Sequence, residues 1–296
     1  MHLITFRRGA RVSIGILNAP AGRLTDLSVS APDLPGDMQD FIALGEGGLT
    51  RAAAAHAASS DGDIDLADVQ LLAPVPTPRR NIMCVGKNYH EHAREFHSSG
   101  FDAAGKQAVP EHPIIFTKLP SSVIGPDVPI PSGNDDTGSV DYEGELTIVI
   151  GPGGRDIAPE NALDHVYGYT IINDVTSRTQ QHRFNQWFLG KSLDGFCPMG
   201  PAIVTADEVG DVSLIRLLTT VNGEIRQDAP VSDLIFDVPT LVSTISRGRT
   251  LLAGDLIATG TAAGVGIGFN PPKFLQPGDQ VNITFDRIGT LRNPVT

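Results

Sequence analysis

An acidic segment that leads directly into a β-branched run, residues 141–150, constrains the fold of this chain more than any other feature. The run over residues 146–150 predicts a buried strand. Side chains alternate across a strand, so we expect Asp141, Glu143 and Glu145 on one face. Like charges placed side by side are costly, because each disfavours ionisation of the others. A divalent cation would offset that cost, and a solvated edge strand whose acids face water is the alternative.

The donor atoms of this segment restrict the ion. Only carboxylate oxygens are offered, and no cysteine or histidine is adjacent. Hard cations prefer oxygen ligands, so we expect Mg²⁺ or Mn²⁺, with Ca²⁺ as a further candidate, and not Zn²⁺. A second β-branched run, residues 167–174, ends in Asp174 just before a helix-prone stretch over residues 179–188. Asp174 is therefore a candidate third ligand beside Glu143 and Glu145, or an ordinary acid at a helix N-terminus.

Composition narrows the class of protein. The 296-residue chain contains 32 glycines and 22 prolines, and 41% of its residues are hydrophobic. This predicts many turns and short strands around a sizeable core, not a helical bundle. The formal net charge of -12 argues against a nucleic-acid partner and against binding to an anionic membrane. The two cysteines are too few for a disulfide framework and no signal-peptide pattern is visible, so we expect a cytoplasmic protein.

A proline-rich connector divides the chain. Residues 71–80 hold three prolines within five positions, a pattern that cannot continue a helix and favours an extended linker. We therefore predict a small N-terminal domain over residues 1–72, without visible catalytic residues, and a catalytic domain over residues 81–296. Within the second domain, the Asn222-Gly223 pair between two β-rich runs predicts a hairpin turn.

A histidine and a glutamate share one face of the helix predicted over residues 90–97. His92 and Glu95 are three positions apart, so the carboxylate can orient the imidazole as a general base. A solvent-exposed polar helix is the alternative. A zinc site formed by His90, His92 and His97 stays open, although helical spacing puts His90 and His92 on different faces. The small polar residues 98–105 that follow are typical of a mobile lid.

Two segments resemble nucleotide-binding motifs but lack their required features. Residues 190–192 have the sequence Gly-Lys-Ser, but the glycine required five positions earlier is Asn185, and the segment follows a helix. The glycine-rich residues 264–268 continue into Phe269 without a helix-forming run. We therefore expect no nucleotide site, while Lys191 remains a candidate cation beside an anionic intermediate.

Seven motifs in order make the chain from residue 81 to 296 resemble the fumarylacetoacetate hydrolase superfamily. They are Gly86-Lys87-Asn88-Tyr89 with His92 and Glu95, Asp141-Tyr142-Glu143-Gly144-Glu145, Asn173-Asp174-Val175-Thr176-Ser177-Arg178, Gly190-Lys191-Ser192, Asn222-Gly223-Glu224-Ile225-Arg226-Gln227, Thr259-Gly260-Thr261 and Ile288-Gly289-Thr290-Leu291-Arg292-Asn293. The resemblance implies an α+β protein with a mixed β-sheet roll, usually homodimeric. It also implies Mg²⁺ or Mn²⁺ held by Glu143, Glu145 and Asp174, and a lid-borne dyad of His92 and Glu95 that activates water.

From the same resemblance, we expect further residues of this domain to act in catalysis or to bind the substrate. Lys191 is expected to act in catalysis. The residues expected to bind substrate are Gln181, Arg178, Lys118, Tyr89 and Thr261.

The predicted activity is a divalent-metal-dependent hydrolysis of a carbon–carbon bond in an acylpyruvate-type 2,4-dioxo acid, which releases pyruvate and a carboxylic acid. Chelation of the substrate through its carboxylate and 2-oxo group would lower the energy of the pyruvate enolate. His92 would activate the water, and Lys191 would add positive charge near the enolate. The alternatives are an oxaloacetate-type decarboxylase, tautomerase or isomerase of the same superfamily, and a metal-stabilised scaffold without turnover.

Overall fold

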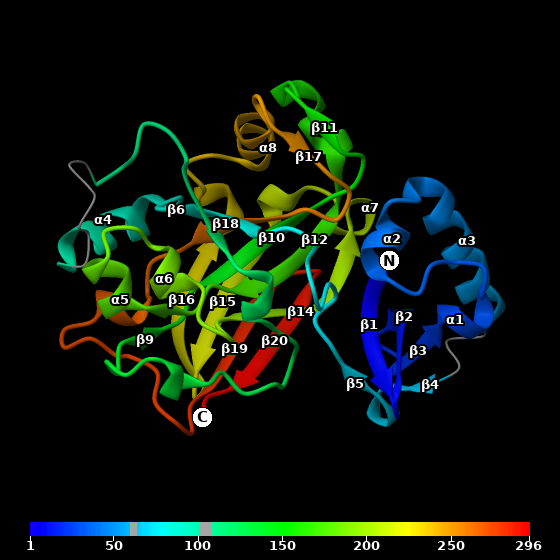
Figure 1. Ribbon diagram of the computed structural model, residues 1–296, viewed down its shortest axis with the longest axis horizontal. Helices are drawn as coiled ribbons and strands as arrows, with labels where there is room; N and C mark the ends of the chain where they lie inside the picture. The colour runs from blue at the N-terminus through cyan, green and yellow to red at the C-terminus, as the bar shows by residue number, and fades with distance from the viewer. Residues whose placement is uncertain (60–63, 101–107) are drawn as a thin grey trace.

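The computed structural model describes residues 1–59, 64–100 and 108–296 (Figure 1). The predicted lid over residues 98–105 lies largely outside the described residues, so it stays a prediction. Two packed sheets with short helices around them confirm the predicted α+β class.

The main sheet has 12 strands in the order β4-β3-β2-β1-β14-β12-β10-β18-β6-β7, with β5 beside β1 and β8 beside β14. Its strands are β1 (His2–Arg8), β2 (Arg11–Asn18), β3 (Arg23–Asp26), β4 (Ile64–Asp65), β5 (Gln70–Leu71), β6 (Ile82–Gly86), β7 (Ile114–Lys118), β8 (Val123–Ile124), β10 (Gly144–Ile150), β12 (Val166–Asn173), β14 (Cys197–Thr205) and β18 (Leu256–Thr261). Every residue of β10 and of β12 is buried, as expected for β-branched runs in the middle of a sheet. The acidic segment therefore leads into a central strand, and the solvated-edge alternative is wrong.

A second sheet of four strands packs against one face of the first. Its order is β16 (Glu224–Pro230), β15 (Arg216–Val221), β19 (Gln280–Phe285) and β20 (Gly289–Pro294). Leu146 and Ile148 of β10 share the largest hydrophobic cluster with Leu217 of β15 and Ile283 of β19. The predicted hairpin is confirmed, because β15 and β16 are joined at Asn222-Gly223.

Two short ladders and the helices complete the fold. The ladders pair β9 (Val140–Asp141) with β13 (Thr176–Ser177), and β11 (Gly154–Arg155) with β17 (Thr250–Leu251). The α-helices are α1 (Leu27–Ser30), α2 (Met38–Ile42), α3 (Gly45–Ala58), α4 (His90–Ser98), α5 (Arg178–Arg183), α6 (Phe188–Lys191), α7 (Ala206–Val209) and α8 (Val238–Ser246). The 3₁₀ turns are η1 (Leu66–Asp68), η2 (Pro120–Ser122), η3 (Ser132–Asn134), η4 (Pro159–His165), η5 (Val212–Leu214), η6 (Val231–Asp233) and η7 (Gly266–Gly268).

One predicted helix differs from the structure. The stretch expected over residues 179–188 is divided into α5 and α6, because Asn185 between them has φ +59°, outside the right-handed helical region. Asparagine is one of the few residues that adopt this conformation readily. The break turns the chain so that α6 packs beside α5.

The N-terminal strands extend the main sheet, since Leu3 of β1 pairs with Ile203 of β14. Together with α1 to α3 they form the blue part of Figure 1, to one side of the packed sheets. The division into domains over residues 1–72 and 81–296 stays a prediction. In the part of the chain that the structure describes, no helix is both long and apolar enough to cross a membrane.

Candidate active site

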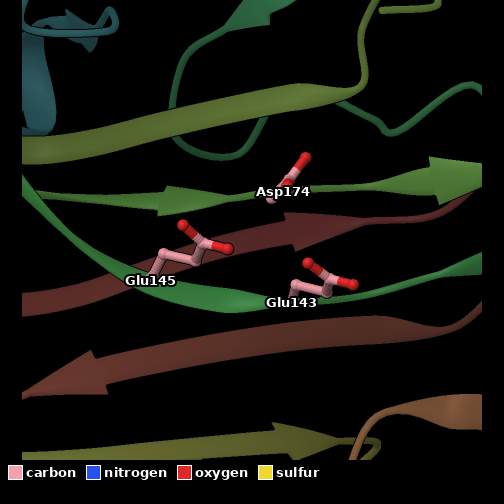
Figure 2. Close-up of side chains that lie close together, drawn as sticks. All are labelled: Glu143, Glu145 and Asp174. Atoms are coloured by element: carbon pink, nitrogen blue, oxygen red, sulfur yellow. The ribbon is translucent and has the colours of Figure 1, made fainter. Parts of the chain in front are cut away.

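Three carboxylates meet where β10 begins and β12 ends (Figure 2). The two strands are antiparallel and pair Gly144 with Asn173, so Glu143 and Asp174, the next residues outward, are neighbours. Glu145 follows Gly144 on β10. One carboxylate oxygen from each acid lies within 4.8 Å of the other two, and all three side chains are buried. The structure thus brings together the three residues that were predicted to bind metal.

Asp141 does not join this triad, although one arginine, Arg178, contacts both Asp141 and Glu143. The segment belongs to two ladders, since β9 ends at Asp141 and pairs with β13, whereas β10 begins at Gly144 and pairs with β12. The simple alternation of one strand is broken between them. The Asp141 carboxylate instead accepts from Arg178 Nε at 2.9 Å and from the Gly266 amide at 2.6 Å.

Three cationic side chains surround the triad. Lys191 Nζ lies 2.8 Å from Glu143 Oε2 and 2.7 Å from Asp174 Oδ2. Lys118 Nζ lies 2.7 Å from Asp174 Oδ1, and Arg178 Nη1 lies 2.7 Å from Glu143 Oε1. All oxygens of two acids are therefore already paired with positive charge, and Lys191 occupies a bridging position between them.

The electrostatics of the three acids differ. Burial disfavours ionisation of Glu143, but Lys191 and Arg178 outweigh it and lower the pKa to about 2. For Glu145, burial and then the negative charges of Asp174 and Glu143 raise the pKa well above its ordinary value. The positive charge of Lys191 and the hydrogen bond from the Gly260 amide are therefore too weak to offset burial and the two neighbouring acids.

A hard divalent cation fits this surplus of negative charge. Within the described residues, the cluster holds four buried acids, Asp141, Glu143, Glu145 and Asp174, and three buried cations that form ion pairs with them, Lys118, Arg178 and Lys191. A divalent ion would make the cluster net positive, which suits an anionic ligand, and carboxylate oxygens are the donors that Mg²⁺ and Mn²⁺ prefer.

A small cavity lies beside Glu143 and Glu145 of the triad. Its lining residues are Val85, Gly86, Lys87, His92, Phe96, Phe116, Glu143, Glu145, Arg178, Gln181, Trp187, Lys191 and Thr261. Of the residues predicted to bind substrate, Arg178, Gln181 and Thr261 are in this lining. Lys118 and Tyr89 are not: Lys118 is buried behind Asp174, and Tyr89 is buried in the hydrophobic core.

The predicted dyad forms at the cavity wall. His92 Nδ1 lies 3.1 Å from Glu95 Oε2, and His92 is only 4% exposed. The exposed-helix alternative is therefore wrong for this face of α4. His90 is exposed on another face, and the metal-ligating side chains that cluster within the described residues are the three acids alone.

Sequence reasoning missed the aromatic wall and one cation of the cavity. Phe116 and Phe96 each contact the edge of Trp187, with ring centroids 5.3 and 5.9 Å apart. Trp187 also explains Gly86, because a Cβ at that position would lie 2.1 Å from the indole ring. Lys87, buried beside Gly86, could have been noticed because it lies inside a motif that also carries the dyad.

Comparisons with known proteins support the family suggested by the sequence. A family model described as "Fumarylacetoacetate (FAA) hydrolase C-terminal" matches residues 81–296. An oxaloacetate tautomerase of Bacillus subtilis is 50% identical over 231 residues, which are 78% of this chain and 74% of that protein.

Solved structures agree with this match. A fumarylacetoacetate hydrolase from psychrophilic Exiguobacterium antarcticum is 43% identical with a TM-score of 0.80, and covers 100% of this chain and 99% of its own. A maleylpyruvate hydrolase from Sphingobium sp. SYK-6, in complex with manganese(II) and pyruvate, is 31% identical with a TM-score of 0.79 and the same coverage. The resemblance and the fold type predicted from the sequence are confirmed: this chain belongs to the fumarylacetoacetate hydrolase family.

Proposed function

We propose that this protein is a divalent-metal-dependent tautomerase that interconverts the keto and enol forms of oxaloacetate or a closely similar 2-oxo dicarboxylic acid. The observation that carries the proposal is that Glu143 and Glu145 of the acidic triad line the same small cavity as His92. The 50% identity to a protein named as an oxaloacetate tautomerase supports the same choice over a hydrolase.

Glu143, Glu145 and Asp174 would hold the ion, and Mg²⁺ or Mn²⁺ is the proposed cofactor. Support comes from the manganese in the maleylpyruvate hydrolase structure. When bound, the ion would draw electron density from the 2-oxo group of a chelated acid and so make the C3 protons more acidic.

His92 is placed to move that proton. A carboxylate can only accept, so Nδ1 donates its hydrogen to Glu95 Oε2 and Nε2 keeps a lone pair. Nε2 can then take a proton from C3 of the keto acid. Its delivery to the 2-oxygen completes the enol, so the net change is one proton moved and no bond between heavy atoms broken.

Two cations of the lining suit the carboxylates of the substrate. Arg178 Nη2 is buried and has no hydrogen-bond partner among the described residues, although Nε and Nη1 are both paired. A buried guanidinium nitrogen without an acceptor is costly, and a ligand carboxylate would satisfy it. Lys87 Nζ lies 5.4 Å from the Phe96 ring centroid and lines the same cavity, so it is our candidate for the second carboxylate.

The deciding experiment follows the enol absorbance of oxaloacetate with the purified protein, with Mg²⁺ or Mn²⁺ and with chelator, while pyruvate is measured in the same sample. We expect the enol to reach equilibrium faster with metal and without pyruvate release. Rapid metal-dependent pyruvate formation would mean a decarboxylase. No acceleration of either process would refute the tautomerase proposal.

Hydrolysis of a 2,4-dioxo acid is the second candidate, and the His92–Glu95 pair favours it because such a dyad can also deprotonate water. The maleylpyruvate hydrolase structure with bound pyruvate supports this candidate. A panel of 2,4-dioxo acids, assayed for pyruvate and for the released acid, tests it. Turnover of one panel member at a higher kcat/KM than oxaloacetate tautomerisation would make hydrolysis the main activity.

We keep the homodimer and the cytoplasmic location as proposals. Light scattering of the purified protein tests the first, and cell fractionation tests the second. A monomeric mass at micromolar concentration would exclude a stable homodimer.

A further inference from the structure

The loop over residues 264–268 contacts both Asp141 and Glu95 of the His92–Glu95 dyad. Its Val265 and Ile267 are buried against Phe96 of α4, the helix that carries the dyad. Gly268 lies so close to Glu95 that it has no room for a side chain. A Cβ at this position would lie 1.8 Å from Glu95 Oε1. The position of this loop therefore decides where Glu95 can lie.

The carboxylate of Asp141 binds two backbone amides in the middle of the loop. Its Oδ1 accepts from the Gly266 amide at 2.6 Å, and its Oδ2 accepts from the Ile267 amide at 3.1 Å. Two successive backbone amides that share one fully buried carboxylate are fixed in both position and orientation. Asp141 Oδ2 also accepts from Arg178 Nε, and Arg178 Nη1 reaches Glu143 Oε1.

The other end of the loop holds Glu95. The Gly264 amide donates to Glu95 Oε1 at 2.9 Å, while Glu95 Oε2 faces His92 Nδ1. Tyr142, next to Asp141, donates its hydroxyl to the Gly264 carbonyl at 2.8 Å. Glu95 therefore has one oxygen fixed by the loop and the other directed to the imidazole.

We propose that Asp141 is a positioning residue that sets the geometry of the His92–Glu95 dyad through the loop over residues 264–268. The connection runs from Glu143 through Arg178 to Asp141, and from there through the loop amides to Glu95. Asp141 touches neither the substrate cavity nor the dyad, so its effect on the proton transfer is indirect. This role goes beyond metal binding, which the other three acids supply.

The substitution Asp141→Asn keeps the size of the side chain but replaces one of its two acceptor oxygens by a donor group. Asparagine has the same shape, but its NH₂ group would face donors, either the Ile267 amide and Arg178 Nε or the Gly266 and Tyr142 amides. At least one loop amide is then left without an acceptor. We expect the loop to shift and kcat to fall by about 10- to 100-fold, as expected for a reacting group displaced by about 1 Å, while the Kd for Mn²⁺ changes less than threefold.

A matched control exists at the other end of β18. Asp255 is also buried and also accepts from an arginine, Arg80 Nη1 at 2.6 Å, and from a backbone amide, Leu252 at 2.9 Å. Asp255→Asn should lower the melting temperature by a similar amount but leave kcat unchanged. If both variants lose the same activity, the effect of Asp141 is only a general loss of stability and the proposal fails.

A double-mutant cycle with Glu95→Gln tests whether Asp141 acts on the proton transfer through Glu95. If Asp141 acts through Glu95, adding Asp141→Asn to Glu95→Gln should lower kcat by less than about threefold further, because the dyad is already impaired. Fully multiplicative effects would show that the two residues act independently and would overturn the proposal. So would a Kd for Mn²⁺ weakened more than tenfold in Asp141→Asn alone.

The kinetic measurements rest on the proposed tautomerase function, so a second readout is independent of activity. Hydrogen exchange of the peptide that spans α4 should be several-fold faster in Asp141→Asn than in the wild type and in Asp255→Asn. Unchanged exchange in α4 would refute the coupling even if the enzyme is a tautomerase. Faster exchange in a protein without tautomerase activity would support the coupling and refute only the activity.

Discussion

Two arginine–aspartate pairs of this protein have nearly the same geometry but opposite surroundings. Arg216 Nε lies 2.7 Å from Asp228 Oδ1 across β15 and β16, with side chains 50% and 47% exposed. Arg178 Nε lies 2.9 Å from Asp141 Oδ2, with both side chains fully buried. The first pair faces water on the second sheet, and the second pair lies beside the candidate active site.

The two pairs have similar distances and differ in burial. Burial, and not the geometry of the ion pair, therefore distinguishes the pair beside the candidate active site from the pair on the surface. Water and salt screen the exposed pair, so its attraction is small. The buried ions have lost their hydration, so removal of one partner leaves an uncompensated charge. Four acids and three cations concentrated in this interior are costly for stability, and such clusters are typical of functional sites. The following predictions test this contrast, from the largest expected effect to the smallest.

Removal of a proposed metal ligand should have the largest effect. Glu143→Ala and Asp174→Ala should each reduce metal-dependent tautomerisation to background, because two acids cannot compete with the hydration shell of the ion. Calorimetric titration with Mn²⁺ and the enol assay measure both properties in one preparation. Asp228→Ala, in the exposed pair, is the control. Full activity of either ligand variant would refute the ligand assignment.

Removal of the base should leave the metal in place. His92→Ala should lower kcat by roughly two to four orders of magnitude, the usual contribution of acid–base catalysis, without a change in Kd for Mn²⁺. Glu95→Gln should cost less, because it keeps a hydrogen-bonding group beside the imidazole. If metal binding is lost together with activity, His92 is a ligand, and unchanged activity would mean it has no catalytic role.

A smaller and selective effect is expected at Lys87. Lys87→Met should lower kcat/KM for oxaloacetate by about 10- to 100-fold, the value of one charge-assisted hydrogen bond. Deuterium exchange into the methyl group of pyruvate, which lacks the second carboxylate, should change less than threefold. Equal losses on both acids would mean that Lys87 supports the fold or the metal site instead of the second carboxylate.

Glu145 is a proposed metal ligand, but its ionised form should lower the stability of the protein when no metal is bound. Its pKa is raised by burial and by Asp174 and Glu143, so the metal-free protein should lose stability as pH rises from the ordinary glutamate value towards the raised one. Glu145→Gln removes that loss. We expect equal melting temperatures near pH 4.5 and a more stable variant at pH 8, measured with chelator. With Mn²⁺ at pH 8, only the wild type should gain stability, and a lower melting temperature of the variant under chelator would contradict the assignment.

The exposed pair should give the smallest effect. Arg216→Ala is expected to change the free energy of unfolding by about 0.5 kcal/mol, within the range of surface ion pairs, and to leave kcat unchanged. Urea denaturation measures the first quantity. A loss several times larger would show that this surface pair contributes more than its exposure predicts.

Much of the site could be predicted because its residues follow recognisable local patterns. Glu143, Glu145 and Asp174 flank β-branched runs, and such runs predict strands wherever they pair. His92 and Glu95 share a helix face by spacing alone. The separation of Asp141 from the triad could not be predicted, because the change of ladder between β9 and β10 depends on partners far away in the chain.

The sequence by itself determined the family, the α+β class, and the candidate acids and the His92–Glu95 pair, because those depend on residue types at short spacing. Only the tertiary structure decided the aromatic wall of Phe96, Phe116 and Trp187, which come from three separate elements. It also decided that Lys118 supports Asp174 from behind, while Arg178 joins Asp141 to Glu143. Such contacts join residues up to dozens of positions apart, and the pairing of charges in a buried cluster depends on distances that only the packed sheets define.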